Sequence, residues 1–345
     1  MRVKTIKNLI FVVITLTILY PQTPLLKYES SLFEDSQVTG DEADPFIVID
    51  NNNNLGLCYT RLGNNNMFGP TIKYAYEVQG NMFWTHEDIS PYDSEEYLEA
   101  QMYYIGTNRI LSFRYHSEFE PNNYILEGGW STFLDPNTGS WQEENSEVPS
   151  FAHTSYMDIA NGSDEIHFLS MSNYYGTREL RYFKRNSNGT YTPNSGYTVV
   201  SSNNVYQGAY FDLTIGDGDT PYFCYREGNN LKARKYGENP VTVATLIEDY
   251  GTWNRKMRKM APPTIAYNGN SGILMIAFSD YDNATGLWSL FYSIWDNAGS
   301  TWSNPEKVFN STVQMTYPYL SADINSGNFF LSYYSFDDSN SSKHV

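Results

Sequence analysis

Cysteine is nearly absent from this chain of 345 residues, which contains only Cys58 and Cys224. At most one disulfide can therefore form. Basic residues are also scarce, since 22 Lys and Arg stand against 39 Asp and Glu and leave a formal charge of −17. Such an acidic chain repels phosphate backbones, which disfavours nucleic acid as a partner. A solvated surface is the ordinary interpretation of this charge, and cation binding is the alternative.

Long apolar runs are lacking too, except for one at the N-terminus. The run from Leu9 to Leu19 follows the positive residues Arg2, Lys4 and Lys7. It is shorter than the roughly 20 residues of a membrane span, but it has the size of a signal-peptide core. We therefore expect a leader over residues 1–26 and a secreted or cell-surface protein. No A-x-A cleavage site follows, so a retained anchor, the only contact with a membrane, stays an alternative.

No long segment has helical periodicity, and the composition favours β-structure instead. The chain contains 30 Tyr, 19 Phe and 7 Trp, and 41 % of its residues are hydrophobic, enough for a sizeable core. Motifs of phosphate-binding loops, nucleophile elbows and dedicated calcium loops are absent, and the histidines lack metal-ligand spacing. His167 is expected to be a satisfied core or interface histidine.

One short apolar pattern recurs along the chain. Each copy has large apolar residues around one small residue, and the copies are 53 to 58 residues apart: 56–60, 110–114, 168–172, 222–226, 275–279 and 330–334. The small residues are Cys58, Ser112, Ser170, Cys224, Ala277 and Ser332. A β-rich segment ending in an Asn, Asp or Gly turn precedes most copies, as "YFDLTIGDGD" (210–219) shows. Each copy is therefore expected to be a β-hairpin.

A second hairpin follows most copies, around residues 74–84, 133–141, 182–191, 231–241 and 292–302. The hairpin at 231–241 is the only one without an aromatic residue at its end. Two hairpins per repeat predict a four-stranded propeller blade. The chain is thus predicted to be all-β, with residues 27–345 forming a single six-bladed β-propeller. The last copy has only two strands before Val345, so we expect an N-terminal segment within 27–38 to complete that blade.

The segment "SIWDNAGSTW" (293–302) carries a family resemblance. It closely follows the Asp-box signature S-x-D-x-G-x-T-W, and the repeats resemble those of the sialidase-like (BNR, Asp-box) propeller superfamily. In that family the box is a turn between the third and fourth strands, remote from the ligand. The resemblance therefore implies structural roles for Asp296, Gly299, Thr301 and Trp302, with the Trp packed between blades.

The resemblance also implies a ligand face at the opposite end, where each second strand leads into the third and each blade into the next. Candidate ligand-binding residues there are Arg61, Arg114, His116, His153, Tyr174, Arg226 and Glu227. A sialidase would hold its substrate carboxylate with several arginines and would use a Tyr nucleophile, a Glu and an Asp. Residues of these types are Tyr317, Glu118, Glu227 and Asp280.

The sequence leaves three functions open. Tyr-rich and Asn-rich loops suit non-catalytic recognition outside the cell, with a glycan as the favoured ligand. The alternatives are a sialidase-type glycoside hydrolase and a structural or protein-binding surface component. The arginine motif of the sialidase first blade is absent, since "ADPFIVID" (43–50) stands in its place. We expect a monomer.

Two further expectations concern thiols and cations. Cys58 and Cys224 occupy the same position in the first and fourth copies, on opposite sides of a ring. Because a disulfide needs Cα atoms within about 7 Å, both are predicted to be free and buried. No cofactor is required, but Asp280 and Asp282 offer oxygen ligands suited to calcium.

Overall fold

The computed structural model describes most of the repeats and none of the residues before Asp41. The described segments are 41–49, 55–62, 71–77, 84–88, 96–105, 108–117, 126–135, 140–143, 154–172, 179–193, 197–202, 211–246, 262–296, 300–310, 312–323 and 326–336. Nearly all described side chains follow residue 159. The predicted leader and the predicted closing segment lie outside these residues. In the part described, no helix is long and apolar enough to cross a membrane.

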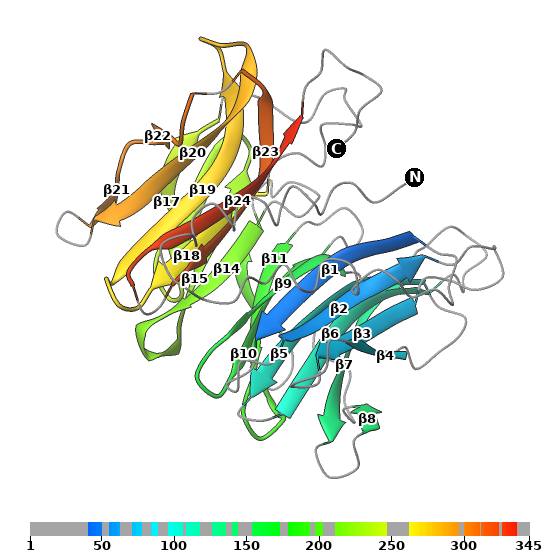
Figure 1. The fold of residues 1–345 in the computed structure, drawn as a ribbon. Coiled ribbons are helices and arrows are strands. Elements are labelled where there is room, and N and C mark those ends of the chain that lie inside the picture. The colour runs from blue at the N-terminus through cyan, green and yellow to red at the C-terminus, as the bar shows by residue number, and fades with distance from the viewer. Residues whose placement is uncertain are drawn as a thin grey trace.

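The described strands form six antiparallel sheets in chain order (Figure 1). The first sheet is β1 (Asp41–Ile49), β2 (Leu55–Leu62), β3 (Thr71–Glu77) and β4 (Trp84–Asp88). The second sheet is β5 (Glu96–Ile105), β6 (Asn108–Ser117), β7 (Leu126–Asp135) and β8 (Ser140–Glu143). The third sheet is β9 (Thr154–Asn161), β10 (Ile166–Ser172), β11 (Glu179–Arg185), β12 (Tyr191–Thr192) and β13 (Thr198–Ser201).

The remaining sheets repeat this arrangement. The fourth sheet is β14 (Phe211–Gly216), β15 (Thr220–Glu227), β16 (Asn230–Lys235) and β17 (Val241–Thr245), with the short 3₁₀ helix η3 (Asp217–Asp219) between its first two strands. The fifth sheet is β18 (Thr264–Asn268), β19 (Ile273–Asp282), β20 (Leu287–Asp296), β21 (Thr301–Trp302) and β22 (Glu306–Lys307). The sixth sheet is β23 (Gln314–Ala322) and β24 (Phe329–Phe336).

Each small residue of the recurring pattern lies in the second strand of its sheet. Cys58 pairs with Phe46 of the first strand, and Cys224 pairs with Asp212 in the same way. The second hairpins are also where the sequence predicts them, as the pairs Glu77 with Trp84 and Trp295 with Trp302 show. The repeat analysis is thus confirmed at the level of strand order and register.

Neighbouring sheets pack against one another, and their first strands contact in the order β1, β5, β9, β14, β18 and β23. Polar side chains join these strands. The Asp212 carboxylate accepts a hydrogen bond from the Ile265 amide at 2.7 Å, and the Thr264 hydroxyl accepts one from the Leu320 amide at 3.1 Å. In the fourth and fifth sheets the first strand therefore positions the first strand of the next sheet through its side chains.

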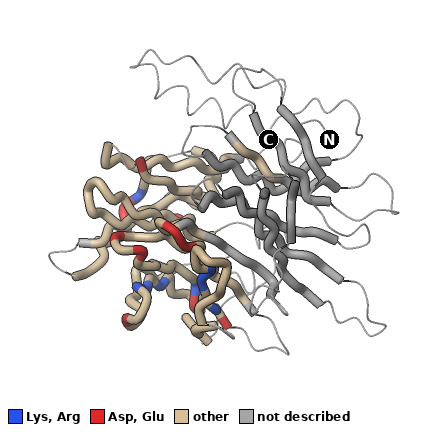
Figure 2. The backbone as a smooth tube through the Cα atoms, turned by 90° about the horizontal axis from the view of Figure 1, so that it is seen from below, with Lys and Arg blue, Asp and Glu red and all other residues tan. Residues whose placement is uncertain are grey.

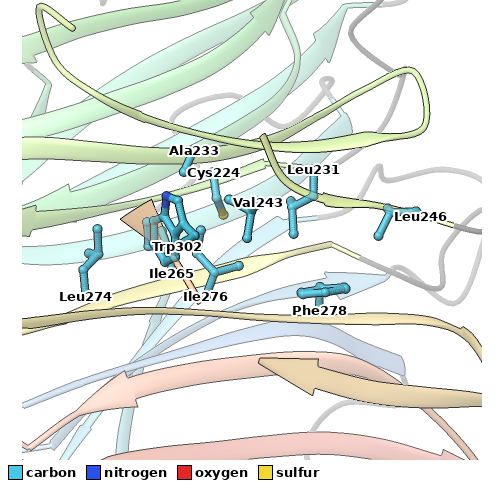
Figure 3. Close-up of a cluster of buried hydrophobic side chains, with 10 residues drawn as sticks. All are labelled: Cys224, Leu231, Ala233, Val243, Leu246, Ile265, Leu274, Ile276, Phe278 and Trp302. Atoms are coloured by element: carbon cyan, nitrogen blue, oxygen red, sulfur yellow. The ribbon is translucent and has the colours of Figure 1, made fainter. Parts of the chain in front are cut away.

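Apolar clusters fill the interfaces between sheets. Figure 3 shows the cluster between the fourth and fifth sheets, where Trp302 packs with Cys224, Ile265 and Ile276. Burial of each large side chain contributes about 1.5–3 kcal/mol. Neither cysteine forms a disulfide and both are buried, as predicted, and burial raises the pKa of the Cys58 thiol far above its usual range.

The third copy differs from the fourth and fifth in the sheet that its small residue faces. Cys224 faces the fifth sheet and Ala277 faces the sixth, so each points to the next sheet along the chain. In the third sheet it is Leu169 and Met171 that pack against the fourth sheet. Because neighbouring strand residues point to opposite faces, Ser170 points the other way.

Candidate functional site

The candidate residues lie at one end of the sheets, which we call the candidate end. In each sheet the candidates that belong to the second strand follow its small residue, within the strand or at its end. Arg61 lies in β2, Arg114 and His116 in β6, Glu227 at the end of β15 and Asp280 in β19. They therefore lie on strands, whereas the sequence analysis expected them just after strands. Three candidates, Glu118, His153 and Tyr174, lie outside the described residues.

The register places a glutamate opposite each candidate cation of the first two sheets. Arg61 pairs with Glu42, and Arg114 pairs with Glu99. His116 pairs with a glutamate on either side, Glu96 in β5 and Glu127 in β7. Directly opposite residues of an antiparallel pair share one face of the sheet. The sequence analysis missed these glutamates, because it considered only the connections from second to third strand and from one blade to the next.

Arg226 lies in the interface between the fourth and fifth sheets. Its side chain is on the same face of β15 as Cys224, which packs against the fifth sheet, and only 1 % of it is exposed. The Nε atom donates a hydrogen bond to the Gly228 carbonyl at 3.0 Å. A guanidinium buried in this way stabilises the turn after β15.

Asp280 lies in the same interface as Arg226. Ile276, Phe278 and Asp280 occupy every second position of β19 and so share one face of the strand. Asp280 therefore faces the fourth sheet, and it is 6 % exposed. Its Oδ1 atom accepts a hydrogen bond from the Tyr281 amide at 2.9 Å. Opposite charges within one interface reduce the cost of burying either of them.

Glu227 points away from Arg226, into the interface between the third and fourth sheets. It accepts a hydrogen bond from the Ser201 hydroxyl at 2.8 Å, and the Lys232 ammonium lies 3.7 Å from its Oε2 atom. The buried Tyr225 adjoins it: burial, followed by the charge of Glu227, raises the pKa of Tyr225 to about 12. A phenol with this pKa stays protonated at neutral pH.

Asp282 takes part in a network at the turn between β19 and β20. Its Oδ2 atom lies 2.6 Å from the Lys307 ammonium and accepts a hydrogen bond from the Thr285 hydroxyl at 2.8 Å. These contacts, with Lys307 first, lower the pKa of Asp282 to about 2. Within the described segments, no group of three acidic, His or Cys side chains is arranged to hold a metal ion.

Tyr317 lies in β23, in a different sheet from the other candidates. It has a φ of 50°, in the left-handed region that side chains rarely adopt, and it is 38 % exposed. The register between β23 and β24 shifts next to it, between Thr316 and Tyr319. This irregularity turns the Tyr317 side chain toward solvent.

The Asp-box segment lies at the opposite end of the fifth sheet, at the turn between β20 and β21. Trp302 is 9 % exposed, and it packs edge-on against Trp295, with ring centroids 5.6 Å apart. This packing between sheets agrees with a structural role for the tryptophan. Thr301 pairs with Asp296 in the hairpin. Gly299 and the side chain of Asp296 lie outside the described residues.

Solved sialidases share the fold of this chain. The intramolecular trans-sialidase from Ruminococcus gnavus, in complex with oseltamivir carboxylate, is 9 % identical and gives a TM-score of 0.51, covering 86 % of this chain and 90 % of that one. The Trypanosoma rangeli sialidase in complex with sialic acid is also 9 % identical, with a TM-score of 0.50 over 87 % of this chain and 53 % of that one. At these identities the likeness concerns the fold alone.

The resemblance to sialidase-like β-propellers is thereby confirmed at the level of the fold. The chain is an all-β protein with the arrangement of this class. No protein-family description matches its sequence, and no curated protein is recognisably similar to it in sequence.

Proposed function

We propose that the protein is an exported six-bladed β-propeller that binds glycans at the candidate end without cleaving them. Two sialidases of this fold were solved with sialic acid or a carboxylate ligand bound, which supports a glycan as the ligand class. Fold alone does not carry function. The proposal therefore depends on how the candidate side chains are engaged.

The side chains of Arg226 and Glu227 point into different interfaces between sheets. This observation favours binding over hydrolysis. Arg226 is buried beside the fifth sheet, whereas Glu227 is bonded to Ser201 and Lys232 beside the third. A retaining hydrolase with two catalytic carboxylates needs them about 5–5.5 Å apart in one pocket, whereas a sialidase uses a Tyr nucleophile instead. Tyr317, the candidate for that role, lies in the sixth sheet and Glu227 in the fourth. Here Glu227 and Asp280 belong to different interfaces, so each has a role in holding sheets together.

The closed ring is part of this proposal. In the fourth and fifth sheets both faces of the second strand are buried, whereas the outer face of the sixth sheet exposes Tyr319 and Phe330, by 61 % and 47 %. Contact with the first sheet would cover these rings, and added outer strands would remove an open sheet edge. The predicted segment within 27–38 would add the outer strands of the sixth blade.

A glycan array probed with the purified chain from Lys27 onward tests the function. We expect selective capture of glycans, with loss in Arg114→Ala of those held at the candidate end, and no release of sialic acid from a fluorogenic sialoside. Repeating the array with EDTA tests calcium: reduced binding would support a site at Asp280 and Asp282. An array without any captured glycan would refute the proposal and would favour a protein partner.

The alternative is a sialidase-type hydrolase. It rests on the position of Arg61, Arg114 and Arg226, which all lie at the candidate end of their sheets. It predicts turnover of the sialoside, with a fall in kcat/KM when Arg114 is replaced by Ala. Turnover by the wild type would replace the binding proposal with this one.

A further inference from the structure

Tyr236 occupies an unusual position for an aromatic residue. It lies in the turn between β16 and β17, in the one second hairpin that has no closing aromatic, and it is 44 % exposed. The turn itself depends on Gly237, whose φ of 81° suits glycine. The corresponding turn of the third sheet, Asn186 to Thr190, is built from small polar residues. The exposed ring of Tyr236 is therefore not required by the turn.

Tyr236 belongs to a set of four rings that we call the tyrosine row: Tyr182, Tyr236, Tyr222 and Tyr267. The ring of Tyr236 rests on the buried Tyr182 of the third sheet, with centroids 4.9 Å apart. On the other side of the fourth sheet Tyr222 stacks on Tyr267 of the fifth, with centroids 6.2 Å apart. The amide of Tyr236 bonds the carbonyl of Pro221, next to Tyr222. The row therefore crosses the rim of three sheets.

The row lies at the hairpin end, which is opposite to the candidate end. This end carries the turns between first and second strands and between third and fourth strands, among them η3 and the turn at Tyr236. Figure 2 views the molecule from below and shows acidic and basic residues interspersed over its described part. A ligand held here would not compete with one at the candidate end.

Polar groups flank the rings. Lys235 and Glu238 form an exposed ion pair of 2.9 Å beside Tyr236. Burial, followed by a hydrogen bond with the exposed Asp217, raises the pKa of Tyr267 to about 12. Tyr236 thus presents an exposed ring, supported by the buried Tyr182, beside carboxylate and ammonium groups that can hydrogen-bond hydroxyls.

We propose that the tyrosine row is a second binding surface, which takes a neutral oligosaccharide. Sugar rings present C–H faces that stack on aromatic rings, and their hydroxyls bond charged side chains at the margin. Asp217, Glu238 and the net charge of −17 disfavour sialylated or sulfated chains. The inference shares only its ligand class with the proposed function, because it concerns the other end of the sheets.

The test compares three variants of the full chain on an array of neutral and sialylated oligosaccharides. Tyr236→Ala removes the exposed ring. Val241→Ala is the matched control, since Val241 is 41 % exposed and lies on the same hairpin outside the row. Arg114→Ala perturbs the candidate end. Thermal unfolding of each variant verifies that the fold is retained.

We expect Tyr236→Ala to weaken binding of neutral oligosaccharides about three- to tenfold, with Val241→Ala matching the wild type. Equal binding by Tyr236→Ala and Val241→Ala would overturn the second surface. Loss of all binding in Arg114→Ala alone would also overturn it, while leaving the proposed function intact. A wild type that captures no glycan would refute both.

Discussion

Replacement of Trp302 by Ala tests whether the sheets are held together by the cluster in Figure 3. The side chain is 9 % exposed, and Ile265 and Ile276 of its own sheet and Cys224 of the fourth belong to the same cluster. Truncation of a buried Trp costs about 3–5 kcal/mol through lost burial and the cavity left behind. Loss of the edge-on contact with Trp295 falls within that range.

Urea unfolding followed by circular dichroism measures this loss as a lower transition midpoint at an unchanged slope. Val241→Ala is the control, and because its side chain is exposed it should change stability by less than about 0.5 kcal/mol. A loss below about 1 kcal/mol in Trp302→Ala would refute the interface between the fourth and fifth sheets. If the Asp box is structural, glycan binding per folded molecule should also be unchanged in this variant.

Three further predictions concern titratable groups. Burial lowers the pKa of His167 from 6.5 to about 4. The contribution of the neutral, buried imidazole to stability is therefore complete above pH 6.5 and is lost as the pH falls toward 4. His167→Gln should flatten the dependence of the free energy of unfolding on pH over this interval, and an unchanged slope would contradict this prediction. The Lys307 contact lowers the pKa of Asp282 to about 2, and Lys307→Gln should raise it toward 3.8 in an NMR titration, whereas no change would contradict the ion pair. Cys58 and Cys224 are buried and form no disulfide, so a thiol reagent should label both only after unfolding, and rapid labelling of the native protein would contradict their burial.

Strand order and register could be predicted from the sequence because each copy repeats its own local signals. Turn residues and alternating apolar residues fix each hairpin without information from other copies. The face of the sheet toward which each side chain points was harder to predict. A one-residue offset turns every side chain of a strand to the other face, and nothing local to Ser170 shows that Leu169 and Met171 pack against the fourth sheet.

The site was less predictable than the fold, because it depends on contacts between distant segments. Arg226 and Glu227 are adjacent in the sequence, so they suggested one pocket, but strand alternation sends them into different interfaces. The partner of Asp282, Lys307, comes from a later strand with no repeat signal. His167 is buried, as the sequence predicted, and its Nδ1 atom lies 2.7 Å from the Tyr182 hydroxyl. The prediction that it is satisfied holds for this nitrogen only, because its Nε2 atom has no hydrogen-bond partner among the described residues.

The most direct test of the central claim is to incubate the chain with a captured glycan and to recover the glycan for mass spectrometry. A glycan-binding propeller without hydrolytic activity predicts saturable capture and release of the intact oligosaccharide. Recovery of a shortened chain, with free sugar in proportion to time and protein, would contradict the account.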